Sequence, residues 1–262
     1  MKDWIFSNYS AFGERIVQPW GIAHIITLLL AIASIICMAI FFRNKEENFK
    51  RNILKCIAII ILLFGIARRI IRLISMTNFS LNSFLNIMLP RPWCAISCCV
   101  FIVTVFVDKK FMYNISAMFG FICTLIFFAY PGVGFNKDFW VFEDLYSVAT
   151  HFLLLVGSLS MITLKFTDFR YNTIWKEGIF YVITLIYSAF LIIFKIEGDP
   201  LYYMPNNDIM KILNINYGVY LVIYILFMLL YFNIFYIIND KENIKKFFKS
   251  LKNKSSNKNV TD

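Results

Sequence analysis

Long apolar runs separated by short polar links dominate this chain of 262 residues. Seven runs approach or reach the length needed to cross a bilayer, whose hydrocarbon core of about 30 Å requires roughly 20 mostly apolar helical residues. The predicted spans are 19–42, 53–76, 89–107, 112–130, 145–164, 179–195 and 217–238. The pattern therefore predicts an all-α polytopic membrane bundle of seven transmembrane helices over residues 1–238, followed by a tail over 239–262.

The composition excludes a soluble globular fold. Hydrophobic residues make up 60% of the chain, whereas soluble domains contain about 45–50% apolar residues with glycine included. Only 16% of residues are charged and 18% are aromatic, which argues against a disordered chain and a nucleic-acid-binding protein. All six cysteines fall inside apolar runs, so we expect free thiols rather than disulfides.

The basic residues are distributed unevenly between the two sides of the predicted bundle. Of the 26 Lys and Arg residues, seventeen lie in the links 43–55, 108–110 and 165–178 and in the tail, whereas five lie on the opposite side. Lys and Arg near helix ends favour the cytoplasmic side. We therefore predict a multi-pass protein of the cell membrane with its N-terminus outside and its C-terminus in the cytoplasm. The basic tail is expected to face anionic lipids of the inner leaflet.

Polar residues inside the spans indicate a candidate site, because such residues are costly in a bilayer and rare. The two histidines of the chain, His24 and His151, both fall within predicted spans. With a rise of about 1.5 Å per residue, His24, Cys94 and His151 lie roughly 7.5 to 9 Å from the outer ends of their spans. Arg72 and Arg68 lie roughly 6 and 12 Å from the outer end of theirs. A thiol, two imidazoles and an arginine pair are thus predicted at one depth in the outer half of the bilayer.

These residue types are typical of nucleophilic chemistry on an acyl group. A thiol becomes a nucleophile when a base takes its proton or when a nearby cation stabilises the thiolate. We expect His151 to be the base and Arg91 to be the cation beside Cys94, with His24 in a supporting position. Cys94 would attack a fatty ester, hold the acyl chain as a thioester and pass it to an alcohol or to water.

The arginine pair predicts the kind of substrate. Arg68 and Arg72 are four residues apart and so lie on one helix face. Two guanidinium groups bind a phosphate or carboxylate through bidentate hydrogen bonds. In an outer leaflet, the simplest such group is the head group of a membrane phospholipid. The acidic residues of the 131–144 link could pair with these arginines, but we expect this link to be a solvated loop.

Other interpretations use the same residues without catalysis. The cysteines can be small hydrophobic residues, His24 can hydrogen-bond a neighbouring helix, and Arg68, Arg69 and Arg72 can extend to the interface. The protein could also be a transport or substrate-binding subunit for an anionic small solute, or a lipid-binding subunit without turnover. The chain has no glycine-rich phosphate loop and no HExxH or CxxC spacing, so we expect no metal and no cofactor.

Three segments resemble a known family: WGIAHIITLLL (20–30), LPRPWC (89–94) and ATHFLLLVGSLSM (149–161). Within seven spans, they resemble the YwaF-like integral membrane proteins, which are related to eukaryotic transmembrane acyltransferases that remodel ether phospholipids. That family is similar in architecture to membrane hydrolases of fatty-acid esters of hydroxy fatty acids. The resemblance covers most of residues 12–238.

The resemblance implies roles for individual residues of this chain. It implies that Cys94 takes the acyl group, that His151 activates the thiol, and that His24 matches the Ala-His pair of the family's first helix. The chain departs from the family motif at Pro92, where the resemblance leads us to expect a histidine. This departure leaves the thiol and the later imidazole in place and argues against a mechanism with three residues.

Overall fold

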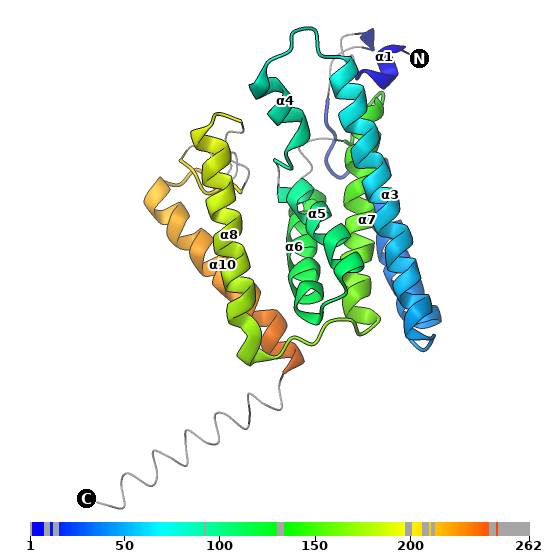
Figure 1. Ribbon diagram of the computed structural model, residues 1–262, viewed down its shortest axis with the longest axis vertical. Helices are drawn as coiled ribbons and strands as arrows, with labels where there is room; N and C mark the ends of the chain where they lie inside the picture. Colours follow the sequence, from blue (N-terminus) through cyan, green and yellow to red (C-terminus); the bar gives the residue numbers. More distant parts are fainter. Residues whose placement is uncertain are drawn as a thin grey trace, which may run out of the picture. The chain divides into compact units, whose positions relative to one another are not determined.

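The computed structural model describes residues 2–7, 11–12, 16–91, 93–129, 134–196, 201–205, 210, 213–240 and 245. The regular secondary structure among these residues is helical, without a strand, and one isolated antiparallel bridge joins Val17 to Asn136. The helices are α1 (Lys2–Ile5), α2 (Ile22–Cys37) with its π-helical end η2 (Met38–Phe42), α3 (Glu47–Ile74), α4 (Leu81–Met88), α5 (Trp93–Val107), α6 (Lys110–Ala129), α7 (Phe142–Thr163), the 3-10 turn η3 (Tyr171–Thr173), α8 (Ile174–Ile193) and α10 (Tyr217–Asn239) (Figure 1).

Each of the seven predicted apolar runs forms a helix, but fewer than seven helices qualify as spans by length and composition. Among the described residues, the helices Ile22–Phe42, Lys110–Ala129, Phe142–Thr163, Tyr171–Ile193 and Tyr217–Asn239 qualify. The pair Leu81–Met88 and Trp93–Val107, bent by 59°, makes a sixth candidate if it is one broken span. The protein is therefore an all-helical, multi-pass membrane protein with five or six candidate spans.

The predicted span 89–107 is wrong at its start, because the helical structure is interrupted there between α4 and α5. Ser80 begins the unpredicted helix α4 as its N-cap, and its hydroxyl accepts a hydrogen bond from the Ser83 N–H at 3.0 Å. Leu89 then has extended backbone angles, as expected for the residue before a proline, here Pro90. The next helix, α5, starts at Trp93, so Cys94 lies in its first turn.

The predicted span 145–164 also starts too late, because α7 begins at Phe142. The Asp144 carboxylate accepts hydrogen bonds from the Val141 N–H at 3.1 Å and from the Asn136 side-chain amide at 2.9 Å. Such bonds satisfy a backbone donor that the first helical turn leaves free. The helix start at Phe142 also places the preceding acidic residue, Glu143, in the first turn of α7.

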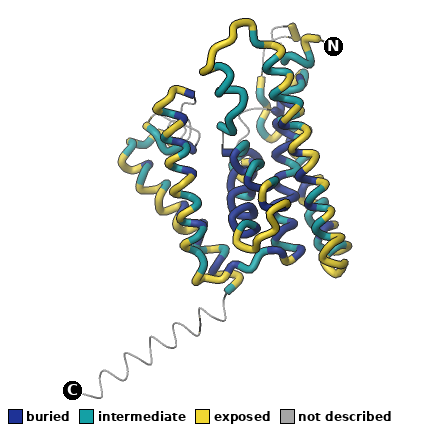
Figure 2. The backbone as a smooth tube through the Cα atoms, in the orientation of Figure 1, coloured by how far each residue is buried: buried dark blue, intermediate teal, exposed yellow. Residues whose placement is uncertain are grey.

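The chain forms two compact units, residues 1–167 with 188–200 and residues 168–187 with 201–262. In the first unit, α6 packs against α5 and α7, and residues 113–120 of α6 are all buried. The buried positions gather on these central helices (Figure 2). Helices α2 and α3 also pack on α7, and their outward faces present apolar side chains such as Leu29 and Leu63. This unit contains all the predicted site residues that the structure describes.

The second unit joins the first part of α8 to α10. The hydroxyls of Tyr181 and Tyr224 are hydrogen-bonded at 2.9 Å, and the Tyr171 hydroxyl donates to the Asn233 side chain at 2.9 Å. The predicted tail 239–262 lies outside the described residues except for Asn239, Asp240 and Lys245.

Candidate active site

Two predicted site residues come together in the first unit. Cys94 lies in the first turn of α5 and His151 lies in α7, and these two helices pack against each other. The thiol and the imidazole lie close enough for each to change the electrostatic environment of the other. Cys94 is half-buried, whereas His151 is only 8% exposed. A nucleophilic group and a basic group are therefore adjacent, although 57 positions separate them in the sequence.

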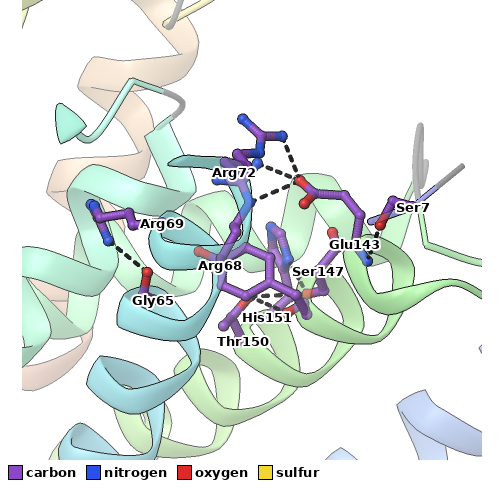
Figure 3. A network of polar contacts seen from close by, with 10 residues as sticks. Ser7, Gly65, Arg68, Arg69, Arg72, Glu143, Ser147, Thr150 and His151 are labelled. Carbon is purple, nitrogen blue, oxygen red and sulfur yellow. Dashed lines mark hydrogen bonds and ion pairs between the residues drawn. The ribbon is translucent and has the colours of Figure 1, made fainter. Parts of the chain in front are cut away.

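The hydrogen bond to His151 determines which ring nitrogen can act as a base. Nδ1 lies 2.6 Å from the Ser147 carbonyl oxygen, one turn earlier on α7 (Figure 3). A carbonyl oxygen can only accept, so Nδ1 carries the proton and the neutral ring keeps its lone pair on Nε2. Nε2 is buried and has no hydrogen-bond partner within the described part of the chain. It is the nitrogen available to take a proton from the thiol.

The structure separates His24 from this pair. Nδ1 of His24 accepts a hydrogen bond from the Trp20 N–H at 2.9 Å. The His24 ring packs on Phe135 at a centroid distance of 4.6 Å, Phe135 lies 5.8 Å from Phe127, and Phe127 stacks on His151 at 3.7 Å. Two phenylalanine rings thus lie between the two imidazoles. The contacts described for His24 are therefore to Trp20 and Phe135 and not to the Cys94 thiol.

The arginine pair predicted to bind a head group shares a carboxylate. Arg68 donates to Oε1 of Glu143 through Nε at 2.8 Å and also through Nη2, and Arg72 donates to the same oxygen at 2.8 Å (Figure 3). The Arg68 guanidinium also lies 4.7 Å above the Tyr146 ring. Our expectation of a solvated loop over 131–144 is therefore wrong for Glu143. An arginine pair inside an apolar run needs a countercharge. This need was the signal in the sequence that an acidic residue such as Glu143 would lie beside the two arginines.

The two remaining arginines of the predicted site region, Arg69 and Arg91, each hydrogen-bond a residue near the C-terminal end of α4. Arg69 donates to the carbonyl oxygens of Gly65 at 3.1 Å and Met88 at 3.3 Å. Nη1 of Arg91, which we predicted to stabilise the thiolate, donates to the Asn86 side chain at 2.9 Å. Pro92, the departure from the family motif, lies outside the described residues.

Two further features affect the chemistry of the Cys94 thiol. The first turn of α5 exposes the partial positive charge of a helix N-terminus, which favours a thiolate. The Cys94 thiol also interacts with that of Cys123 on α6, a residue that the sequence did not single out.

All six cysteines are free thiols, as predicted. Within the described residues, no group of three or more His, Cys, Asp and Glu side chains is arranged to hold a metal ion.

Comparison with known protein families gives a match over most of the chain. The sequence profile of the TMEM164 family matches residues 19–242, which is most of the chain. No curated protein and no solved structure matches it. The more specific YwaF-like assignment, which rests on three short segments, stays a prediction.

Proposed function

The chain belongs to the TMEM164 family, and we propose that this integral membrane protein is a phospholipid or fatty-acyl transferase or esterase with Cys94 as nucleophile and His151 as base. The observation that supports the proposal is the proximity of the α5 thiol to an imidazole whose Nδ1–H is held by the Ser147 carbonyl. A nucleophile, an adjacent base and a group that orients the base together form the arrangement that nucleophilic catalysis requires.

The proposed reaction has two half-reactions. Nε2 of His151 takes the thiol proton while Cys94 Sγ attacks the carbonyl carbon of a fatty ester. The ester C–O bond then breaks, and the leaving alkoxide takes the proton from the imidazolium, which leaves an acyl thioester on Cys94. An acceptor alcohol or water next gives its proton to Nε2 and attacks the thioester. The C–S bond breaks, the new ester or free acid leaves, and the thiolate regains the proton.

The arginine cluster supports an anionic head group on the lipid donor. Glu143 balances only one of the two positive charges of Arg68 and Arg72, and each of these side chains keeps guanidinium donors beyond those bound to Oε1. A phosphate could bind through the remaining donors.

The proposal includes the topology predicted from charge. With α3 counted as a seventh span, the N-terminus lies outside and the site opens toward the outer leaflet of the cell membrane. Helix α3 has 28 residues, which is about 42 Å at 1.5 Å per residue and long enough to cross. Its charged residues gather at its two ends, where long basic side chains can reach the interfaces.

The test is the detection of a fatty chain on Cys94. Purified protein incubated with a phospholipid of defined acyl chains should gain the mass of one acyl group, and neutral hydroxylamine should remove it. Peptide mapping should place this group on Cys94. The matched control is Cys99→Ser, because Cys99 is also half-buried on α5. It should acquire the acyl group normally, whereas Cys94→Ser should acquire none that hydroxylamine removes. Turnover of lipid that is unchanged in Cys94→Ser would refute the proposal.

A further inference from the structure

The His151 ring is held by an aromatic contact as well as by its hydrogen bond. Phe127 of α6 stacks on the imidazole with a centroid distance of 3.7 Å and an interplanar angle of 10°. Both side chains are buried, Phe127 at 7% exposure and His151 at 8%. The stack therefore joins α6 to the base on α7 inside the bundle.

The single hydrogen bond from Nδ1 does not define the plane of the imidazole. The bond to Ser147 holds one atom of the ring, so the ring can still tilt about that atom and move Nε2 away from the thiol. A parallel ring at van der Waals distance opposes this tilt, because rotation toward Phe127 drives the imidazole into its face and rotation away from it breaks the stacking contact. The hydrogen bond and the stack together hold Nε2 in position.

Phe127 is itself held from two directions. Phe128 lies edge-on to it with centroids 5.2 Å apart and planes at 85°, and Phe135 lies 5.8 Å away. Phe135 is fixed in turn by its backbone, whose carbonyl accepts a hydrogen bond from the Gln18 N–H at 2.8 Å, and by the His24 ring. This packing leaves Phe127 little freedom to follow a tilting imidazole.

We propose that Phe127 is the positioning residue of the catalytic base: its ring holds the plane of His151 so that Nε2 stays directed at the Cys94 thiol. The inference rests on the proposed function and adds a residue to that site. When the imidazole takes the thiol proton, the aromatic face also stabilises the resulting cation, since the faces of aromatic rings attract positive charge. Phe127 would thus act on both the geometry and the charge of the base without touching the substrate.

The experiment measures the reactivity of Cys94 itself, so it needs no natural substrate. Full-length protein in detergent is treated with iodoacetamide at several pH values, and mass spectrometry follows the alkylation of Cys94 and Cys99 separately. The variants are Phe127→Leu and Phe127→Met, which remove the ring but keep apolar volume, and His151→Ala. Phe166→Leu is the matched control, because it removes an equally buried phenylalanine whose ring stacks on Tyr113 rather than on His151 or Phe127.

The outcomes separate this inference from the proposed function. General-base assistance is worth about 10²–10⁴-fold in rate, so His151→Ala should lower the Cys94-to-Cys99 alkylation ratio at neutral pH by about ten-fold or more. The two Phe127 variants should lower this ratio by about three-fold or more and should require a higher pH to recover the wild-type rate, while Phe166→Leu should stay within about two-fold.

Two results would count against the account, each at a different point. If both folded Phe127 variants keep the wild-type ratio and pH profile while His151→Ala loses them, then Phe127 only fills space and the proposed function stands. If His151→Ala keeps the wild-type ratio, the thiol and imidazole do not act as a pair and the proposed function fails with the inference.

Discussion

The close approach of α7 to α5 at Gly157 predicts how packing controls the site. A Cβ atom at position 157 would lie 2.5 Å from Cζ and 2.6 Å from Cε2 of Phe101, which is fully buried on α5. Ordinary carbon contacts begin near 3.5 Å, so in Gly157→Ala the ring or the helix must shift by about 1 Å. Such overpacking of a well-packed core costs about 1–3 kcal/mol.

The chain offers a matched control in Gly178 of α8, where an added Cβ meets nothing within 4 Å. Replacing a helical glycine with alanine gains roughly 0.5–1 kcal/mol from the backbone at either position. Only Gly157→Ala has the steric cost as well. The difference in unfolding free energy between the two variants should therefore be about 1–3 kcal/mol, with Gly178→Ala the more stable.

The same shift should reach the chemistry, because α5 and α7 carry Cys94 and His151. A misplacement of about 1 Å can cost a factor of up to about 10² in rate. The assays are denaturant unfolding of the protein in detergent and the rate at which Cys94 gains its acyl group. If Gly157→Ala is as stable as Gly178→Ala and acylates Cys94 at the wild-type rate, then the two helices do not meet as described.

Two further predictions concern charge. Glu143→Gln should lower the unfolding free energy by about 1–2 kcal/mol, because it leaves the partly buried Arg68 and Arg72 without their shared carboxylate; denaturant unfolding measures the loss, and a wild-type value at low salt would refute the role of the ion pairs. An epitope tag at the N-terminus should react with antibody on intact cells, whereas a C-terminal tag should react only after permeabilisation; the reverse labelling would contradict the predicted orientation.

The sequence predicted the helices well because apolar length is a local property. All seven apolar runs form helices, and each helix overlaps most of its predicted run. The errors occur at the helix ends, because single residues determine where a helix starts or stops. Pro90 forces Leu89 out of the helix and separates α4 from α5, and the Asp144 cap extends α7 by three residues beyond its predicted start.

The sequence predicted the site only in part, because it does not show which helix faces meet. Cys94 and His151 could be selected as a thiol and an imidazole at similar depth, and the structure packs their helices together with the two side chains near each other. Depth alone also selected His24, which packs behind two phenylalanine rings. Phe127 could not be found in this way, since the chain contains 29 phenylalanines and only tertiary packing distinguishes the one that stacks on the base.

Cross-linking between Cys94 and a cysteine at position 151 measures their adjacency most directly. The parent protein keeps Cys94 and has the other five cysteines replaced by alanine. An imidazole reaches farther from its Cα than a cysteine thiol does, so the two positions can face each other without the close Cα spacing that a direct disulfide requires. A short thiol-specific cross-linker such as dibromobimane spans the remaining gap, so His151→Cys should be joined to Cys94, seen as the added mass of one bridging group. His24→Cys should remain unlinked. A folded His151→Cys protein that is not cross-linked, or a link formed equally well from position 24, would contradict the proximity of thiol and imidazole on which the account depends.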